Sequence, residues 1–298
     1  MKIAVLSDIH SNHLALKAVM NHIEKLESTR QWKISEYWFT GDLLGYGPHA
    51  LEVLRIAREK FETRSWILGN HDALYAGYLL SDLVREEAVD AILKNTEQIN
   101  QDAEMAEWIN NVFVDLHHRQ SLILDSNGDG VTFTLAHGCM KDAYHLYVYP
   151  WTKPEILDDY MIIPAKKLFN GEPYPRVILF GHSHVPALIR YTDNNFEDVR
   201  IEEYGKPYAF SPEWSMINPG SVGQPRDFDD RAAYAVLDTA EKTVTFFRVA
   251  YEVEDTALDL QKGHYPNRLL AQLMKADGLK PSEAYTQLLK ERANRNGE

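Results

Sequence analysis

The stretch MKIAVLSDIH at residues 1–10 determines the predicted fold. Its apolar run from Ile3 to Leu6 is typical of a short buried strand, and Asp8 and His10 follow where that strand would end. The next apolar residues recur at helical spacing: Leu14, Leu16, Val19, Met20 and Ile23. A strand, a polar loop and a helix in this order predict the first unit of an α/β fold.

The same order returns twice along the chain. The sequence EYWFT at 36–40 predicts a second strand, which ends at Gly41-Asp42 and leads into a helix over 50–60. Residues 65–68 predict a third strand, which ends at Gly69-Asn70-His71. Because strands that alternate with helices form crossovers, polar residues should collect at the carboxyl ends of these strands.

The middle of the chain departs from this alternation. Residues 73–116 are acidic and contain no proline, which predicts inserted helices that could form a lid, a dimer surface or a solvated face. The following sequence SLILDSNGDGVTFTLAHG, residues 121–138, has two strand-like runs around Asn-Gly and Asp-Gly. This is a hairpin signal, and it places His137 at a strand end.

The second half is predicted to be rich in strands. Residues 143–175 are expected to be irregular, and 176–180 predict a strand that leads into GHSH at 181–184. Four further runs predict an antiparallel meander: 187–191, 215–218, 233–238 and 243–249. Helical spacing resumes over about 255–298, with a helix start at Pro281-Ser282-Glu283. Since the sequence has no repeat or linker, we expect one domain over residues 1–298.

Composition excludes several classes of protein. The 44 acidic and 31 basic residues give a formal charge of −13, which argues against a partner such as long nucleic acid. The longest apolar run, residues 232–237, is far shorter than the roughly 20 residues of a membrane span, so no membrane segment is expected. The single cysteine, Cys139, cannot form an internal disulfide. The apolar stretch at the start of the sequence is too short for the hydrophobic region of a secretory signal. These features favour a cytoplasmic location.

Polar residues gather at the predicted strand ends: Asp8, His10, Asp42, Asn70, His71, His137, His182 and His184. One such residue alone is usually a cap, but eight after five strands indicate an active site. Imidazoles and carboxylates without thiolates suit Mn, Fe, Zn or Co. Seven of the eight are good metal ligands, which is too many for one tetrahedral ion with an open position. Two ions that share a carboxylate would use them all.

These residues also carry a family resemblance. In order and spacing they resemble the five signature blocks of the calcineurin-like metallophosphoesterase superfamily: Asp8-x-His10, Gly41-Asp42, Gly69-Asn70-His71-Asp72, His137 and Gly181-His182-Ser183-His184. The resemblance covers about residues 1–240, and NPGSVGQPR at 218–226 resembles its bacterial and archaeal branch of small phosphodiesterases and diadenosine-tetraphosphatase-like proteins. The implied fold is a four-layer α/β/β/α sandwich of two mixed β-sheets flanked by helices.

The resemblance also implies residue roles. Two divalent metal ions would be bound, with manganese favoured and iron, zinc, nickel, cobalt or magnesium acceptable. The implied ligands are Asp8, His10 and His184 for the first ion, Asn70, His137 and His182 for the second, and Asp42 as the bridge. A hydroxide that bridges the ions would attack phosphorus, His71 would protonate the leaving group, and Asn70 would also contact substrate.

One departure from the family narrows the choice of substrate. Protein serine/threonine phosphatases of this superfamily follow Gly-Asp with two residues and then Asp-Arg-Gly, whereas Gly41-Asp42 is followed here by LLGYG. A phosphoprotein phosphatase is therefore disfavoured, and Asp72 either supports His71 or is a solvated loop residue. Tyr46 and Arg226 lie in loops that should approach the metals. They could stack on a base and bind phosphate, or have no role.

The predicted function is a metal-dependent hydrolase of small phosphodiesters or nucleotide pyrophosphates, so the expected partner is a small phosphorylated substrate, nucleotides included. One alternative is a phosphomonoesterase, because a metal pair does not itself select between these esters. Another is a catalytically silent binding module on the same fold, against which the intact His71 and seven ligands argue.

Overall fold

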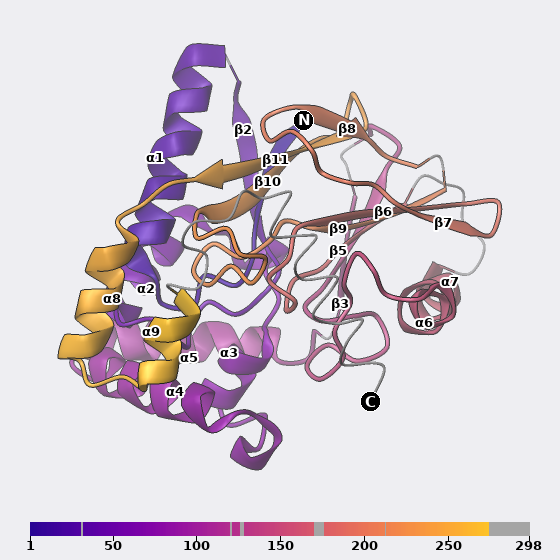
Figure 1. Ribbon diagram of the computed structural model, residues 1–298. Coiled ribbons are helices and arrows are strands. Elements are labelled where there is room, and N and C mark those ends of the chain that lie inside the picture. The colour runs from indigo at the N-terminus through magenta and orange to yellow at the C-terminus, as the bar shows by residue number, and fades with distance from the viewer. Residues whose placement is uncertain (31, 120, 126–127, 170–175, 212, 274–298) are drawn as a thin grey trace.

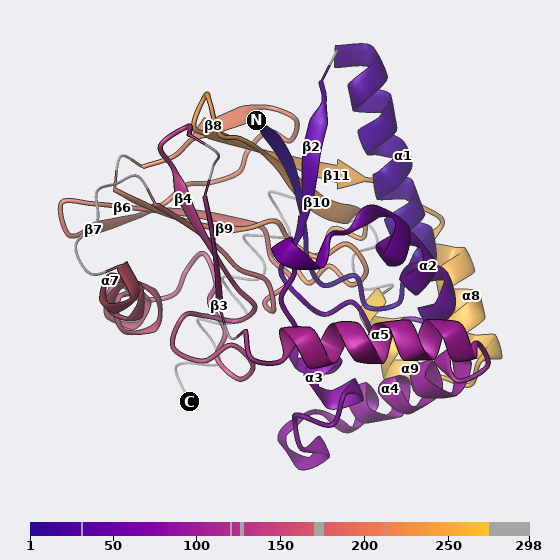
Figure 2. The same cartoon turned by 180° about the vertical axis from the view of Figure 1, so that it is seen from behind.

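Two mixed β-sheets pack face to face in the computed structural model, with helices on their outer faces (Figures 1 and 2). The structure describes residues 1–298 except 31, 120, 126–127, 170–175, 212 and 274–298. The predicted α/β/β/α sandwich is confirmed. None of the described helices is long and apolar enough to cross a bilayer, while the cytoplasmic location and the single domain stay predictions.

The first sheet contains the strand with which the chain begins. Its order is β2-β1-β10-β11-β8, in which β1 pairs with β2 in parallel and with β10 antiparallel. The bounds are β1 (Lys2–Leu6), β2 (Ile34–Phe39), β8 (Pro207–Ala209), β10 (Ala232–Asp238) and β11 (Thr243–Val249). Asp8 and Asp42 therefore leave the same edge of this sheet, because β1 and β2 run in the same direction.

The second sheet has the order β3-β4-β5-β9-β6-β7. Its neighbours β4, β5 and β9 are parallel, whereas the β3–β4 and β6–β7 pairs are antiparallel. The bounds are β3 (Ser121–Asp125), β4 (Thr132–Ala136), β5 (Arg176–Leu179), β6 (Ala187–Thr192), β7 (Asn195–Asp198) and β9 (Trp214–Asn218). The predicted hairpin over 121–138 is confirmed, and His137 directly follows β4.

Side-chain alternation along the strands divides the core into layers. Ile3 and Val5 of β1 face the second sheet, where they join a cluster with Phe133. Ala4 and Leu6 point the other way, toward helices α1 (His13–Arg30) and α2 (Ala50–Lys60). Because successive strand residues point to opposite faces, one short strand contributes to both layers.

The predicted insert forms helices beside the first sheet (Figure 2). Its bounds are α3 (Asn70–Tyr75), the 3₁₀ turn η2 (Ser81–Leu83), α4 (Glu86–Ile99) and α5 (Ala103–Leu116). Helix α3 begins earlier than the predicted insert and includes Asn70 and His71. Helices α8 (Val253–Lys262) and α9 (Asn267–Leu273) confirm helical spacing near the carboxyl end, and the helix start expected at 281–283 lies outside the described residues.

The predicted third strand over 65–68 is wrong. The 3₁₀ turn η1 (Thr63–Ser65) occupies its start, and only one bridge, between Phe39 and Trp66, joins it to the first sheet. The Ile67 N–H donates to the Phe39 carbonyl at 3.2 Å, after which the chain turns into α3. The segment is extended but too short to form a ladder.

The irregular segment expected over 143–175 is also partly wrong. Residues 154–169 form α6 (Pro154–Leu157), the π-helical turn η3 (Asp158–Ile162) and α7 (Ile163–Phe169) without a break. Leu157, Met161 and Ala165 recur at helical spacing and are buried against the second sheet. This packing stabilises the helix.

The expected antiparallel meander is partly wrong. β6 pairs antiparallel with β9 and β10 with β11, as predicted, but the two pairs belong to different sheets. β6 and β9 belong to the second sheet, whereas β10 and β11 belong to the first. β9 is buried along its whole length beside parallel β5, and the unpredicted strands β7 and β8 lie at sheet edges. The chain therefore crosses between sheets over 219–231, beside the predicted site.

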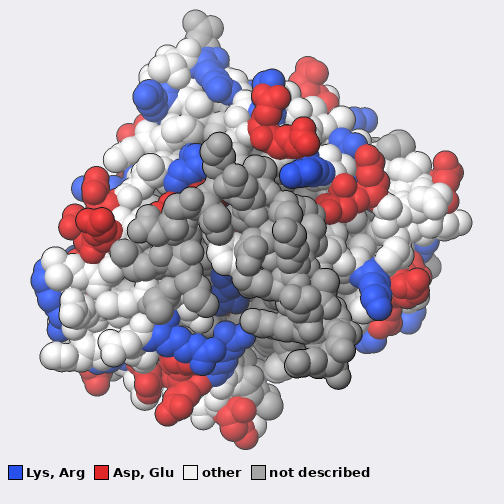
Figure 3. Space-filling model, viewed as in Figure 1, with Lys and Arg blue, Asp and Glu red and all other residues white. Residues whose placement is uncertain are grey.

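Charged side chains of both signs are interspersed on the face seen in Figure 3. Among the described residues of that face, no broad basic field is present. That long nucleic acid is not a partner stays a prediction from net charge.

Candidate metal centre

All seven predicted ligands lie together in the interior, where the strand ends of the two sheets meet. Each is at most 6% exposed. Asp8 and His10 follow β1, Asp42 follows β2, His137 follows β4, and His182 and His184 follow β5. Asn70 reaches the same place from the first turn of α3.

The ligand atoms form two groups that share one carboxylate. Asp8, His10, Asp42 and His184 have ligand atoms within 4.8 Å of one another, as do Asp42, His137 and His182. In the first group His184 Nε2 is 3.3 Å from Asp8 Oδ1, and His10 Nε2 is 3.6 Å from Asp42 Oδ2. Asp42 is thus placed between two potential cation sites.

Asn70 completes the second group. Its Oδ1 lies 3.2 Å from His137 Nε2, which is itself 3.3 Å from Asp42 Oδ2. The His182 Nε2 atom is buried and has no hydrogen-bond partner among the described residues. An imidazole nitrogen in that state is suited to metal coordination.

Backbone carbonyls determine which nitrogen of three histidines faces the centre. The Nδ1 atoms of His10, His137 and His184 lie 3.1, 2.8 and 2.6 Å from the carbonyls of Leu44, Thr40 and Gln224. A carbonyl only accepts, so each Nδ1 donates. The Nε2 atoms of His10 and His184 thus present lone pairs to the centre, and that of His137 does so once its second proton has left. His10 and His184 then approach to 3.1 Å between two Nε2 acceptors, which a cation between them would stabilise. The residues therefore fit a metal pair.

The loops that carry the ligands have strained backbones. Five of the predicted ligands have φ between 48° and 64°, namely Asp8, His10, Asp42, His182 and His184, and Ser11 beside His10 has φ 50°. This left-handed region is uncommon for residues with a side chain. Hydrogen bonds between loops hold it, since Asp8 N–H donates to the Gly41 carbonyl and His10 N–H to the Asp42 carbonyl, both at 3.0 Å.

Glycines leave room for this crowding. A Cβ on Gly69 would overlap the Asp42 carboxylate, and one on Gly181 would overlap Ser7 and Asp8. The glycines that flank the signature residues are therefore required by close approach to the ligands.

Burial dominates the protonation of the centre. It lowers the pKa values of His10, His182 and His184 well below the usual imidazole value, so these rings are neutral. Burial also raises the pKa of Asp8 to about 7, and the charge of nearby Asp42 adds to this shift. Metal ligands must be deprotonated, so metal binding would release the Asp8 proton.

His137 differs from the other histidines. Burial opposes its charge, but the adjacent Asp42 carboxylate raises the pKa of His137 to about 9. In turn, burial favours protonated Asp42, yet the charge of His137 holds the pKa of that carboxyl well below its usual value. The two groups form a buried ion pair that a cation would replace.

His71 lies beside the first group without joining it. Its ring centroid is 4.7 Å from that of His10 and 4.4 Å from that of Tyr46. His71 Nδ1 has no hydrogen-bond partner among the described residues, and a Cβ on Gly45 would overlap it. Gly45 thus lies against the Nδ1 side of the His71 ring.

Asp72 has a role that sequence reasoning missed. It is fully buried, and its carboxylate accepts from the N–H groups of Asp42, Leu43, Leu44 and Gly69 at 2.9–3.1 Å. No contact with His71 is among these bonds, so Asp72 is neither a solvated loop residue nor a hydrogen-bond partner of that ring. It ties the loop after β2 to the start of α3.

Tyr46 and Arg226 come together from different loops. Tyr46 is 8% exposed, with its ring 4.6 Å from that of His10, and Arg226 Nη2 is 3.4 Å from the Tyr46 hydroxyl. The guanidinium also donates to Gln224 Oε1 at 3.0 Å. Their roles toward substrate stay predictions.

A stack of aromatic rings leads outward from the second group. Tyr147 lies 3.8 Å from His182 between ring centroids, at an interplanar angle of 19°. Tyr149 and Trp151 continue the stack at centroid distances of 6.0 and 5.1 Å. Tyr147 is 37% exposed and places an aromatic edge beside the candidate metals.

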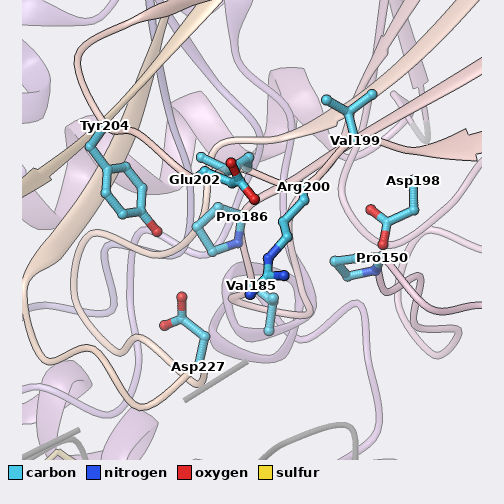
Figure 4. A pocket seen from close by; sticks show the side chains of 10 residues that line it. Pro150, Val185, Pro186, Asp198, Val199, Arg200, Glu202, Tyr204 and Asp227 are labelled. Atoms are coloured by element: carbon cyan, nitrogen blue, oxygen red, sulfur yellow. The ribbon is translucent and has the colours of Figure 1, made fainter. Parts of the chain in front are cut away.

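A cavity of about 170 Å³ adjoins the centre (Figure 4). One lining residue, Val185, follows the candidate ligand His184 in the chain. Tyr204, Asp227 and Arg200 point into it. Three carboxylates and one guanidinium line it, and one of the carboxylates, Asp227, is paired with Arg248.

Comparisons with known proteins agree with this geometry. A family model described as calcineurin-like phosphoesterase matches residues 1–186. An uncharacterized protein from Methanocaldococcus jannaschii is 30% identical over 267 residues, which cover 90% of this chain and 95% of that protein. A symmetrical bis(5'-nucleosyl)-tetraphosphatase from Erwinia tasmaniensis is 34% identical over 104 residues, 31% of this chain and 36% of that protein.

Two solved structures share the fold over most of their length. A metallophosphoesterase from Sphaerobacter thermophilus aligns with a TM-score of 0.68 and 28% identity, covering 93% of this chain and 99% of that one. A hypothetical protein from Pyrococcus horikoshii has the same TM-score and coverage at 18% identity.

The Asp72 bonds predict a large effect on stability. Asp72→Asn replaces one acceptor oxygen by an NH₂ group that faces buried N–H donors, so the free energy of unfolding should fall by about 2–4 kcal/mol. Urea unfolding in the presence of a chelator measures this. The matched control is Asp82→Asn, at an exposed position of η2, and equal midpoints for the two variants would contradict the assignment.

Proposed function

Since this chain belongs to the calcineurin-like phosphoesterase family, we propose that it hydrolyses small phosphodiesters or nucleotide pyrophosphates at a dinuclear metal centre. The observation that carries the proposal is the pair of buried ligand groups that share Asp42. Family members are phosphoester hydrolases that depend on two metals, so the activity class follows from membership and the substrate is the proposed part.

The proposed ligand sets follow the two groups. Asp8, His10 and His184 would hold one ion, Asn70, His137 and His182 the other, and Asp42 would bridge them. Two divalent cations would supply Lewis acidity that neutralises phosphate charge and lowers the pKa of water. Asn70 would also contact substrate. Manganese stays the favoured metal because of the family resemblance, since these ligand types accept several ions.

His71 is proposed as the proton donor to the leaving group. Gly45 covers the Nδ1 side of its ring, which leaves Nε2 as the atom that can reach substrate. Burial lowers the pKa of His71 to about 4. The negative charge of a bound phosphate beside the ring would raise that pKa, so that His71 would be protonated before it transfers the proton to the leaving group.

Arg226 is proposed to bind a phosphate oxygen. It is held by Tyr46 and Gln224 near the first ligand group, and a guanidinium so placed favours anionic esters. A phosphomonoesterase remains the alternative within enzymes, because the metal pair accepts either ester. The intact ligand groups argue against the catalytically silent binding module.

A nucleotide substrate is supported by Tyr147. Base stacking on an aromatic side chain contributes about 1–3 kcal/mol per base, and Tyr147, which is partly exposed, lies next to His182. The similarity to bis(5'-nucleosyl)-tetraphosphatase over 104 residues points in the same direction.

Metal removal tests the activity class. Chelation should abolish hydrolysis of bis-p-nitrophenyl phosphate, and Mn²⁺ should restore it with two ions per chain by elemental analysis. Asp42→Asn should lose both metal and activity, whereas His118→Ala, at a residue remote from the ligand groups, should lose neither. No turnover of this ester, p-nitrophenyl phosphate or diadenosine tetraphosphate with Mn²⁺, Co²⁺, Ni²⁺, Zn²⁺ or Mg²⁺ would favour the binding module.

His71→Ala tests proton donation. It should lower kcat by about 10²–10⁴-fold for esters with basic leaving groups, while metal content stays at the wild-type value. Steady-state kinetics with parallel metal analysis provides the measurement. Unchanged turnover of a fully loaded variant would remove His71 from the mechanism.

Tyr147→Ala tests the nucleotide preference. If a base stacks there, KM for diadenosine tetraphosphate should rise about 5- to 150-fold, and KM for p-nitrophenyl phosphate should change much less. Tyr147→Phe keeps the ring and serves as the control. An equal change for both substrates would mean that Tyr147 only supports His182.

A further inference from the structure

Helix α4 of the insert reaches the loop that faces His71. Asn95, in the middle of this helix, is fully buried. Its Oδ1 accepts from the Gly45 N–H at 2.8 Å and from the Ser11 hydroxyl at 2.7 Å. One side chain thus contacts the residue after the metal ligand His10 and the loop that follows Asp42.

The amide nitrogen of Asn95 holds the other side of the same loop. Its Nδ2 donates to the Gly47 carbonyl at 3.0 Å and to the Tyr265 hydroxyl at 3.4 Å. The residues on both sides of Tyr46 are therefore bonded to Asn95. Both acceptor lone pairs and both donor hydrogens of the amide are used, which fixes its orientation.

Gln98, one helical turn later, continues this arrangement. Its Oε1 accepts from the Ala50 N–H at 3.0 Å, and its Nε2 donates to the Pro48 carbonyl at 2.8 Å and to the Tyr265 hydroxyl at 3.4 Å. Tyr265 comes from the connection between α8 and α9. The insert and the carboxyl-terminal helices thus meet over one active-site loop.

The loop in turn determines where His71 can lie. Gly45 is in van der Waals contact with the His71 ring, with no room for a Cβ between them. The Tyr46 ring lies 4.4 Å from His71 and 4.6 Å from His10. A shift of Gly45 would move or release the ring of His71, because no hydrogen bond from a described residue holds its Nδ1.

We propose that Asn95 is a positioning residue, which holds Gly45 and Tyr46 against His71 and so sets the orientation of the proton donor from the helical insert. The inference rests on the role proposed for His71. We therefore expect a change at Asn95 to alter proton donation to the leaving group, through His71, and to leave metal binding unaffected. Every hydrogen bond of Asn95 goes to the loop, Ser11 or Tyr265, and none goes to a ligand side chain.

The test uses the full-length, metal-loaded protein and the variant Asn95→Asp. This change keeps the acceptor for Gly45 and Ser11 but turns the donor to Gly47 into a repelling oxygen. We measure kcat and KM for aryl phosphodiesters whose phenol leaving groups differ in basicity. Proton donation matters most for poor leaving groups, so kcat should fall about 10- to 100-fold for these and far less for p-nitrophenol.

Asn100→Asp, at an exposed position at the end of α4, is the matched control and should behave as wild type. Gln98→Glu alters the same loop at its far end and should show the same leaving-group dependence more weakly; it decides the question if Asn95→Asp does not fold. A uniform loss across all leaving groups, or a loss that follows metal content, would overturn the inference. If His71→Ala itself shows no leaving-group dependence, the proposed role of His71 fails instead.

Discussion

The burial of two carboxylates side by side is the constraint on which this structure depends. Asp8 and Asp42 are at most 1% exposed, and an unpaired ion in the interior costs several kcal/mol. The chain surrounds them with neutral imidazoles whose Nδ1 atoms are held by carbonyls, and it pairs Asp42 with His137. The glycines, the left-handed loops and the Asp72 bonds are the means by which the backbone approaches closely enough to hold this arrangement.

Much of this arrangement could be predicted from sequence, because ligands adjacent to strand ends are local features. Asp8 after β1 and His137 after β4 need only a strand and its end to be recognised. The assignment of strands to sheets could not be read in this way. β9 and β10 are neighbours in the chain and are both buried over most of their length, yet they belong to different sheets. Their sequence patterns do not show which sheet each strand joins.

The residues that sequence reasoning missed act across long separations. Asn95 belongs to a helix whose composition suggests only a charged insert, and its partners Gly45 and Tyr265 are 50 and 170 residues away. Asp72 was noticed, but its partners are backbone N–H groups of the loop after β2, which carry no side-chain signal. In the sequence, the available hint of such a role was an Asn in an otherwise acidic helix; its burial became visible only in the structure. The sandwich therefore presents the candidate metal ligands, while the helices outside it hold the loop on the other side of His71.

The central position of β1 has a consequence for synthesis of the chain. Lys2 pairs with Asp238, 236 residues later, so the strand that carries the first ligands gains its antiparallel partner only when most of the chain exists. At roughly 5–20 residues per second, a ribosome needs about 10–50 s to make that partner. During this interval the apolar residues of β1 lack half of their sheet. A nascent chain of this protein therefore carries β1 with one edge unpaired until residues 232–238 have been made.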